Sequence, residues 1–302
     1  MSGDAALAAA YAEARPRLTR MAYAMLGSHA EAEDVVADCW LRLAAANARE
    51  PVRDVEGWAV VAVARGALDT LRSARSRRET YVGPWLPEPL LTAAGTAPDP
   101  ADRVTLDESV SFALLVVLER LSPAERTAWV LHDLFRLEFP EVAEIVGRTP
   151  AAVRQLASRA RRHVADGTPR RGVATEQHRA AVAAFAAAAA GGDLAALTAV
   201  LDPRVVLTSD GGGEVTAARK PVLGPDRVAR FLIGVAGRIG PDQRIVPVQV
   251  NEGPGFAVLD GTRVTMVMAL TLDGGLVTRV DTVLAPAKLA GCRPPAPPRA
   301  AP

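Results

Sequence analysis

Cysteine is scarce in this chain of 302 residues: Cys39 and Cys292 stand far apart, with no CxxC pair and no Cys/His cluster. Such spacing supports neither a disulfide framework nor a metal site, and it fits a reducing compartment. No stretch approaches the roughly 20 apolar residues of a membrane span, and the N-terminus lacks the pattern of a signal peptide. We therefore expect a cytoplasmic protein with no membrane partner, no metal and no cofactor.

Lysine and net charge are also scarce. The formal net charge is +1, and Lys220 and Lys288 are the only lysines among 35 basic residues. A nucleic-acid site would therefore be a local patch and not a property of the whole surface. The planar fork of arginine suits phosphate and guanine contacts, although a genome rich in GC codons explains the same excess.

The first stretch of the chain has a helical period. Apolar residues recur at three- and four-residue steps from about Leu7 to Arg78, Ser28 suits an N-cap, and Pro51 interrupts the pattern. The last helix, over about 55–78, begins apolar and ends basic. The sequence therefore predicts an all-helical domain over residues 5–80.

A linker is expected over residues 81–106, where prolines and glycines gather. It carries Trp85, Leu86 and Leu90, which an inert solvated connection would not need. We expect this linker to dock on another part of the protein.

Helical periodicity returns over residues 107–167. Ser122, Pro123 and Glu125 form the pattern of an N-cap, a first-turn proline and a capping box. A short helix over 140–146, a turn at Gly147 and an arginine-rich helix capped by Thr149 follow. This order is typical of a helix-turn-helix domain.

The character changes over residues 174–290. Two helices, over about 176–190 and 194–201, precede strand-like runs at 205–208, 245–250, 256–259, 264–272 and 276–284. Asp273-Gly274-Gly275 is a hairpin signal between the last two runs. The pattern predicts an α+β domain of helices and antiparallel strands, followed by a Pro-rich tail over 291–302 that we expect to be disordered.

Several of these segments resemble known regions of bacterial sigma factors. Residues 32–42 (AEDVVADCWLR) resemble the core-polymerase-binding helix of sigma region 2. Gly57-Trp58, followed by residues 68–72 (LDTLR), resembles the part that melts and reads the −10 element. Residues 121–126 (LSPAER) and the arginines from 154 to 162 resemble sigma region 4, which reads the −35 element. The resemblance covers roughly the first half of the chain.

Three further motifs resemble the sigma-J-like group of extracytoplasmic-function sigma factors. They are WLPEP at 85–89, DGGG at 210–213 and NEGPG at 251–255. The resemblance implies a multidomain fold of two all-α sigma domains, the second with a helix-turn-helix, and a C-terminal α+β SnoaL-like cone. In that group the extension stands in for a separate anti-sigma protein. The chain departs from the family at Ala37, often glutamine, and at Glu214, often basic.

The resemblance and the helical spacing together assign candidate sites. An acidic helix face around an apolar centre would bind core RNA polymerase: Glu33, Asp34, Val35, Asp38 and Trp40. An aromatic side chain and one arginine-bearing side of the next helix would hold −10 DNA: Trp58, Arg65, Arg72 and Arg75.

The helix after Gly147 would read −35 DNA, with its start in the major groove and its later arginines on phosphates. Its candidates are Arg154, Gln155, Ser158, Arg159, Arg161 and Arg162. The linker and two C-terminal loops are expected to make regulatory interdomain contacts. Their residues are Trp85, Leu86, Pro87, Glu88, Pro89, Asp210, Gly211, Gly212, Gly213, Asn251, Gly253 and Gly255.

Two alternatives stay open. Domains of the SnoaL type often enclose an apolar cavity, so a small molecule is a candidate ligand and the chain could be an enzyme fused to a DNA-binding module. Asp210 and Asp281 are candidate bases there, but the region has no tyrosine and only His178 as histidine. A ligand-sensing helix-turn-helix regulator that acts without polymerase is the other alternative, and it gives the acidic helix no purpose. We assign no catalytic residue.

Overall fold

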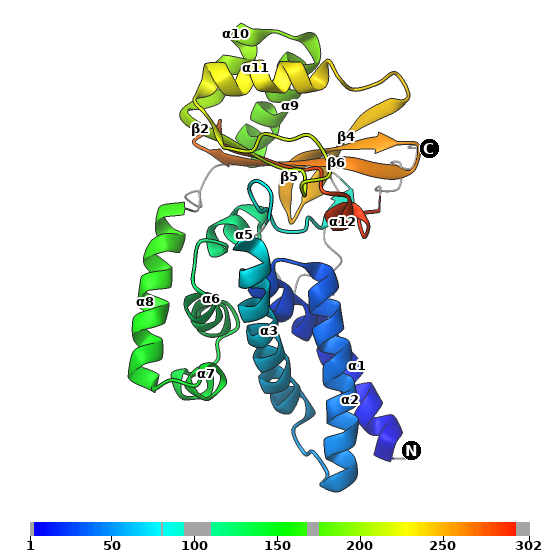
Figure 1. The fold of residues 1–302 in the computed structure, drawn as a ribbon, viewed down its shortest axis with the longest axis vertical. Coiled ribbons are helices and arrows are strands. Elements are labelled where there is room, and N and C mark those ends of the chain that lie inside the picture. The colour runs from blue at the N-terminus through cyan, green and yellow to red at the C-terminus, as the bar shows by residue number, and fades with distance from the viewer. Residues whose placement is uncertain (1–2, 80, 94–109, 168–174, 294–302) are drawn as a thin grey trace. The chain divides into compact units, whose positions relative to one another are not determined.

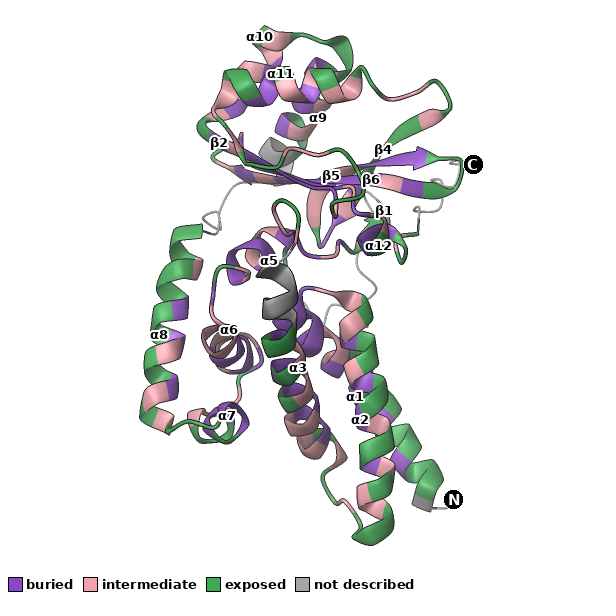
Figure 2. Ribbon diagram, viewed as in Figure 1, coloured by how far each residue is buried: buried purple, intermediate pink, exposed green. Residues whose placement is uncertain are grey.

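Three long helices occupy the first part of the computed structural model, which describes residues 3–79, 81–93, 110–167 and 175–293 (Figure 1). They are α1 (Gly3–Leu26), α2 (His29–Arg49) and α3 (Val55–Glu79). Ser28 caps α2 as predicted, because its hydroxyl accepts a 3.2 Å hydrogen bond from the Glu31 N–H. Their facing sides are apolar and buried (Figure 2).

Shorter elements follow: α5 (Phe112–Leu118), α6 (Pro123–Trp129), the π-turn η2 (Val130–Leu134), α7 (Phe139–Val146) and α8 (Pro150–Gly167). The predicted helix-turn-helix is α7 and α8, joined at Gly147 in the left-handed conformation with φ 71°. The Thr149 hydroxyl accepts from the Ala152 N–H at 3.2 Å, as expected of an N-cap.

The first three helices share one core with α6, η2, α7 and α8, and the chain divides so that these elements form one compact unit, here called the helical unit. Arg126 lies within this core, with only 1% of its surface exposed. Its guanidinium donates to the Ala24 carbonyl at 3.2 Å and pairs with Glu119 at 2.5 Å. One buried cation thus ties α6 to α1.

The predicted capping box at the start of α6 is formed on both sides. The Ser122 hydroxyl accepts from the Glu125 N–H at 3.3 Å, and the Glu125 carboxylate accepts from the Ser122 N–H at 3.1 Å. Burial raises the pKa of Glu125, but hydrogen bonds from Ser122 and the positive charges of Arg159 and His163 outweigh it and lower that pKa overall.

Replacing Ser122 by alanine is expected to lower the free energy of unfolding by about 1 kcal/mol, the usual loss of an N-cap. The Glu125 carboxylate and N–H each lose a hydrogen-bond partner in this variant. Urea unfolding of the full chain measures the change. Thr198→Ala in the other unit is a control for the measurement, and an unchanged Ser122→Ala midpoint would contradict the prediction.

The second unit, here called the sheet unit, contains the described part of the linker, residues 81–93, and the described C-terminal residues 175–293. Its helices are α9 (Thr175–Gly191), α10 (Leu194–Ala199), α11 (Pro225–Ala236) and α12 (Pro286–Leu289). Its strands are β1 (Leu91–Ala93), β2 (Leu201–Asp210), β3 (Val222–Leu223), β4 (Gln243–Val250), β5 (Gly253–Asp260), β6 (Arg263–Asp273) and β7 (Leu276–Val283). They form one sheet in the order β1-β4-β5-β6-β7-β2-β3.

Helices α9, α10 and α11 cover one face of this sheet (Figure 1), where Phe185, Leu197 and Leu232 pack on the strands. All neighbouring strands are antiparallel except β2 and β7, which are parallel. Asp273 pairs with Leu276 across the predicted Gly274-Gly275 hairpin, whose glycines have φ of 58° and 82°. The helical fold expected for the first half of the chain and the α+β fold expected for the C-terminal half are confirmed.

Four elements of the sheet unit differ from the sequence prediction, because α11, α12, β1 and β3 were not expected. α11 does carry a helical signal, because Pro225 follows Gly224 and the buried Val228 and Leu232 are four residues apart. The strands β1 and β3 are too short for an alternating pattern to appear. Within the described residues, no helix is long and apolar enough to cross a membrane.

Candidate functional site

The acidic face predicted on α2 is exposed. Glu33, Asp34 and Asp38 point to solvent, while Val35 and Trp40 are half-buried against the core of the helical unit. Trp40 also packs on Tyr11, with ring centroids 5.3 Å apart. The neighbouring side chain of Leu41, which sequence reasoning missed, is 66% exposed. Acidic groups around an exposed apolar side chain suit a partner surface that is basic around an apolar pocket.

The predicted −10 candidates on α3 divide into two kinds. Arg65 and Arg72 are exposed, and Arg72 lies 3.4 Å from Asp69 on the same helix. Trp58 is half-buried and packs against the core, so part of its ring serves folding. The side chain of Arg75 lies outside the described residues.

The predicted −35 helix, α8, is amphipathic. Val153, Ala157 and Ala160 are buried, and all six predicted DNA contacts are exposed on the opposite side (Figure 2). The arginines differ in their surroundings. Arg161 is already paired with Asp133 of η2 at 2.5 Å, whereas the guanidinium of Arg154 lies 5.1 Å from the ring centre of Phe139.

Asp210, at the end of β2, holds the linker inside the sheet unit. Its buried carboxylate accepts from the Tyr81 hydroxyl at 2.5 Å and from the Leu86 N–H at 2.8 Å. The ammonium of Lys288 lies 2.6 Å away on α12. Burial, and then the hydrogen bond to Asp210, raise the pKa of Tyr81, so this hydroxyl stays protonated as a donor.

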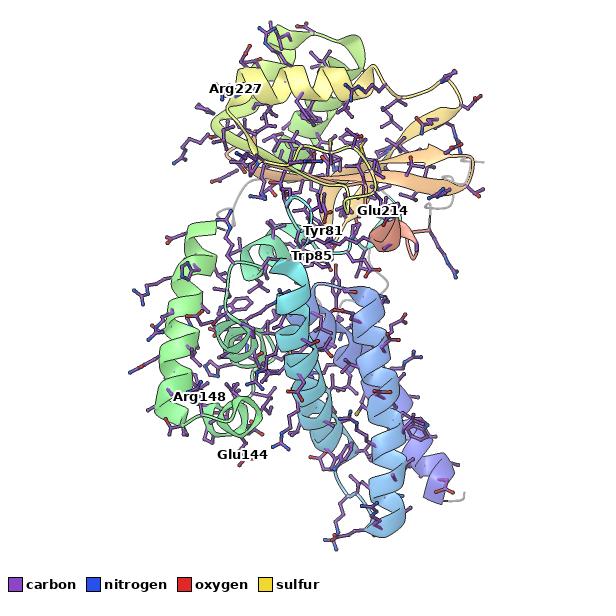
Figure 3. All side chains as sticks on the ribbon, in the orientation of Figure 1. Tyr81, Trp85, Glu144, Arg148, Glu214 and Arg227 are labelled. Carbon is purple, nitrogen blue, oxygen red and sulfur yellow. The ribbon has the colours of Figure 1, made fainter. Side chains whose placement is uncertain are left out.

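Lys288, like Leu41, was missed by sequence reasoning. Its ammonium lies 3.2 Å from the ring centre of Trp85 and 5.1 Å from that of Tyr81. These two linker residues lie close together (Figure 3), and their rings meet edge to face. Lys288 also donates to the Leu86 carbonyl. Lys288 is only 8% exposed. It binds the linker both through its charge and through the aromatic rings. The hint in the sequence was that Lys288 is one of only two lysines in the chain.

Other described residues of the linker also pack within the sheet unit. Leu86, Pro87 and Pro89 are buried. The Cys292 thiol donates to the Pro89 carbonyl at 3.4 Å, and burial followed by the charge of Glu88 raises the pKa of Cys292 to about 12. The thiol is therefore protonated and acts as a packing group.

Asn251 fixes the far end of the linker. Its side-chain oxygen accepts from the Leu90 N–H at 3.0 Å, and its own N–H donates to the Leu90 carbonyl at 2.9 Å. Strand β1 then continues the sheet beside β4, with Leu91 opposite Val250. Asn251 and Glu252 have φ of 48° and 66°, so within residues 251–255 the left-handed backbone conformation is confined to these two residues.

The glycines of the two motifs have separate reasons. Gly253 and Gly255 lie within β5, where a Cβ on Gly255 would stand 2.4 Å from the Met268 carbonyl. Gly212 and Gly213 have φ of 68° and 79°, and a Cβ on Gly213 would meet the Val82 side chain at 3.2 Å. Gly211 has Val215 O at 2.1 Å from its would-be Cβ. These glycines permit close backbone packing, including against the linker.

The two carboxylates considered as candidate bases are both engaged. Asp210 holds the linker, and Asp281 accepts two hydrogen bonds from Arg279, at 2.6 and 2.7 Å. A cavity of about 30 Å³ lies between α11 and the sheet, lined by Phe231, Met268 and Thr282 among others. It has room for ordered water but not for a drug-sized molecule. The side chain of His178 lies outside the described residues.

The chain is similar to known bacterial sigma factors. The family "Sigma-70 region 2" matches residues 10–77, and "Sigma-70, region 4" matches residues 111–164. The ECF RNA polymerase sigma factor SigJ of Mycobacterium tuberculosis is 39% identical over 287 residues, which cover 92% of this chain and 91% of that protein. The probable ECF sigma factor SigI of the same organism is 35% identical, covering 96% of this chain and 97% of that one.

A solved structure has the same architecture. The crystal structure of Mycobacterium tuberculosis SigJ superposes with a TM-score of 0.73 at 36% identity, and the match covers 93% of this chain and 97% of that chain. The likeness therefore spans both helical regions, the linker and the sheet unit. The chain belongs to the family of extracytoplasmic-function (ECF) RNA polymerase sigma factors.

Proposed function

We propose that this protein directs core RNA polymerase to specific promoters and that its sheet unit regulates this activity in cis through the linker. The α2 face binds core polymerase, α3 holds the opened −10 DNA, and α8 reads the −35 element. The protein would act in the cytoplasm, with core polymerase and promoter DNA as partners.

The observation that carries the proposal is the exposed arginine face of α8 behind a capped helix-turn-helix. A helix with a buried apolar side and an exposed Arg/Gln/Ser side can enter the major groove and read base edges. The acidic face of α2 adds the polymerase contact, which a plain helix-turn-helix regulator would not need. Because both candidate bases are engaged, we do not propose an enzyme.

Support for regulation in cis comes from the linker. Residues 81–93 join the two sigma regions, and Asp210, Lys288 and Asn251 hold this segment on the sheet unit. Any rearrangement that separates the two sigma regions by extending this segment must first release these contacts. The sheet unit can thus set how readily the sigma factor adopts the form that spans a promoter.

A titration of core RNA polymerase tests both parts of the proposal. We expect the full chain to bind, and we expect Lys288→Met and a chain ending at Val173 to change core affinity or promoter output in the same direction. Lys220→Met, which replaces the other lysine, is the matched control and should behave as the unchanged chain. If no form binds core polymerase, the sigma function is wrong. If all forms behave alike, regulation through the linker is wrong.

A further inference from the structure

Phe139, at the start of α7, contacts a side chain from each of two neighbouring segments. The His132 ring of η2 stacks on it, with centroids 3.7 Å apart and planes 27° apart. The guanidinium carbon of Arg154 lies 5.1 Å from the same ring centre, within the range of a cation–π contact. Phe139 itself is half-buried and packs against the core of the helical unit, so the position of its ring is fixed.

The π-turn η2 fixes the His132 ring that stacks on Phe139. His132 Nδ1 lies 2.8 Å from the Leu137 carbonyl, and the chain reverses at Arg136 with φ 63°. The ring orientation of His132 is therefore held by the backbone, and its stacking limits the rotation of Phe139. A π-turn at this point is a local departure from regular helix of the kind found at functional sites.

Two arginines of α8, Arg154 and Arg161, have different partners. Asp133 of η2 pairs with Arg161, which neutralises that charge in the free protein. In the part of the chain that the structure describes, no carboxylate forms an ion pair with Arg154. Its guanidinium rests on an uncharged ring, which leaves its charge and its in-plane N–H groups for another acceptor.

We propose that Phe139 is a positioning residue that holds Arg154 in place to read one base of the −35 element. This inference rests on the proposed sigma function. Arg154 lies in the N-terminal part of α8, the part of a recognition helix that reaches base edges, and arginine binds guanine through two parallel hydrogen bonds. A guanidinium held before DNA arrives loses less side-chain freedom on binding, so the pre-positioned arginine discriminates bases more strongly.

The test measures transcription by core polymerase with the full chain on promoters randomised at the −35 element. We expect Arg154→Ala to abolish the base preference at one position. Phe139→Leu should weaken the preference at that same position by roughly two- to fivefold, the size of one cation–π contact. Phe139→Tyr should keep it, because the ring is retained. The double variant should show no further loss at this position, because both changes act on one contact.

Arg162→Ala is the matched control, since this exposed arginine lies farther along α8, and it should lower output on all templates alike. A uniform loss of output in Phe139→Leu, with base preference unchanged, would show a merely structural role and overturn the inference. A change at a different base position from that of Arg154→Ala would also overturn it. Absence of promoter-dependent transcription by the unchanged chain would instead overturn the proposed function, and this inference with it.

Discussion

Replacing Asp210 by asparagine should release the linker and destabilise the sheet unit by about 3–5 kcal/mol, the cost of breaking a buried ion pair on one side. Asp210 is 0% exposed and serves Tyr81, Leu86 and Lys288 at once. The amide removes the carboxylate charge that faces the Lys288 ammonium. Its NH2 group, in place of one oxygen, also faces two donors: either the Leu86 N–H and the Lys288 ammonium, or the Tyr81 hydroxyl and the Gly212 N–H. We expect much faster hydrogen exchange of the Leu86 and Leu90 amides, measured by mass spectrometry on the full chain.

Asp226→Asn is the control for this substitution, because Asp226 forms a surface pair with Arg230 on α11 and no contact with the linker in the described structure. Its linker exchange should equal that of the unchanged chain. The double variant Asp210→Asn/Lys288→Met should lose less stability than Asp210→Asn alone, since the buried ammonium that faced the carboxylate is removed as well. Unaltered protection of the Leu86 amide in Asp210→Asn would refute the role of Asp210 as the linker anchor.

Arg126→Met should destabilise the helical unit by about 3–5 kcal/mol, for a related reason. The guanidinium is the buried partner of Glu119, whose side chain is 11% exposed, and it also satisfies the Ala24 carbonyl of α1. Methionine fills most of the volume but removes the hydrogen bonds that Arg126 donates to the Glu119 carboxylate and the Ala24 carbonyl. Urea unfolding of the full chain, followed by tryptophan fluorescence, measures the loss.

Adding Glu119→Gln to Arg126→Met should recover part of this stability, because the largely buried negative charge that faced Arg126 is removed. Arg72→Met is the matched control: its pair with Asp69 is solvent-exposed and should contribute less than about 1 kcal/mol. Equal effects of Arg126→Met and Arg72→Met would contradict the buried role of Arg126. A further loss on adding Glu119→Gln would contradict the charge pairing.

The sequence was most informative where the physics is local. Capping by Ser28, Ser122 and Thr149, the turn at Gly147 and the Gly274-Gly275 hairpin each depend on a few adjacent residues, and all were predicted correctly. The exposed face of α8 follows from helical periodicity in the same way. The family resemblance then supplied what local rules cannot, namely the identity of the two sigma regions.

The parts that sequence did not give depend on contacts between distant residues. Asp210 was singled out as a motif member and a candidate base, yet its partners lie 124 and 78 positions away at Leu86 and Lys288. No periodicity links these positions, and a lone lysine in a short helix carries no pattern. Arg126 was read as part of a sigma motif, and only the structure shows that its charge is buried. The domain boundaries, and the roles of the site residues, stay predictions.

The docking of residues 81–93 limits the distance that the linker can span. Residues 81–93 are held on the sheet unit, so only residues 94–109 are left to connect that anchored segment to Val110. A freed stretch the length of 81–93 can extend to about 45 Å, which is the length of about 13 base pairs at 3.4 Å each. Undocking would therefore let this stretch span up to about 45 Å, so the gain in reach is that length less the distance that the docked segment already covers. Under the proposed function, the sheet unit would then limit how far apart the two DNA elements that the sigma factor contacts can lie.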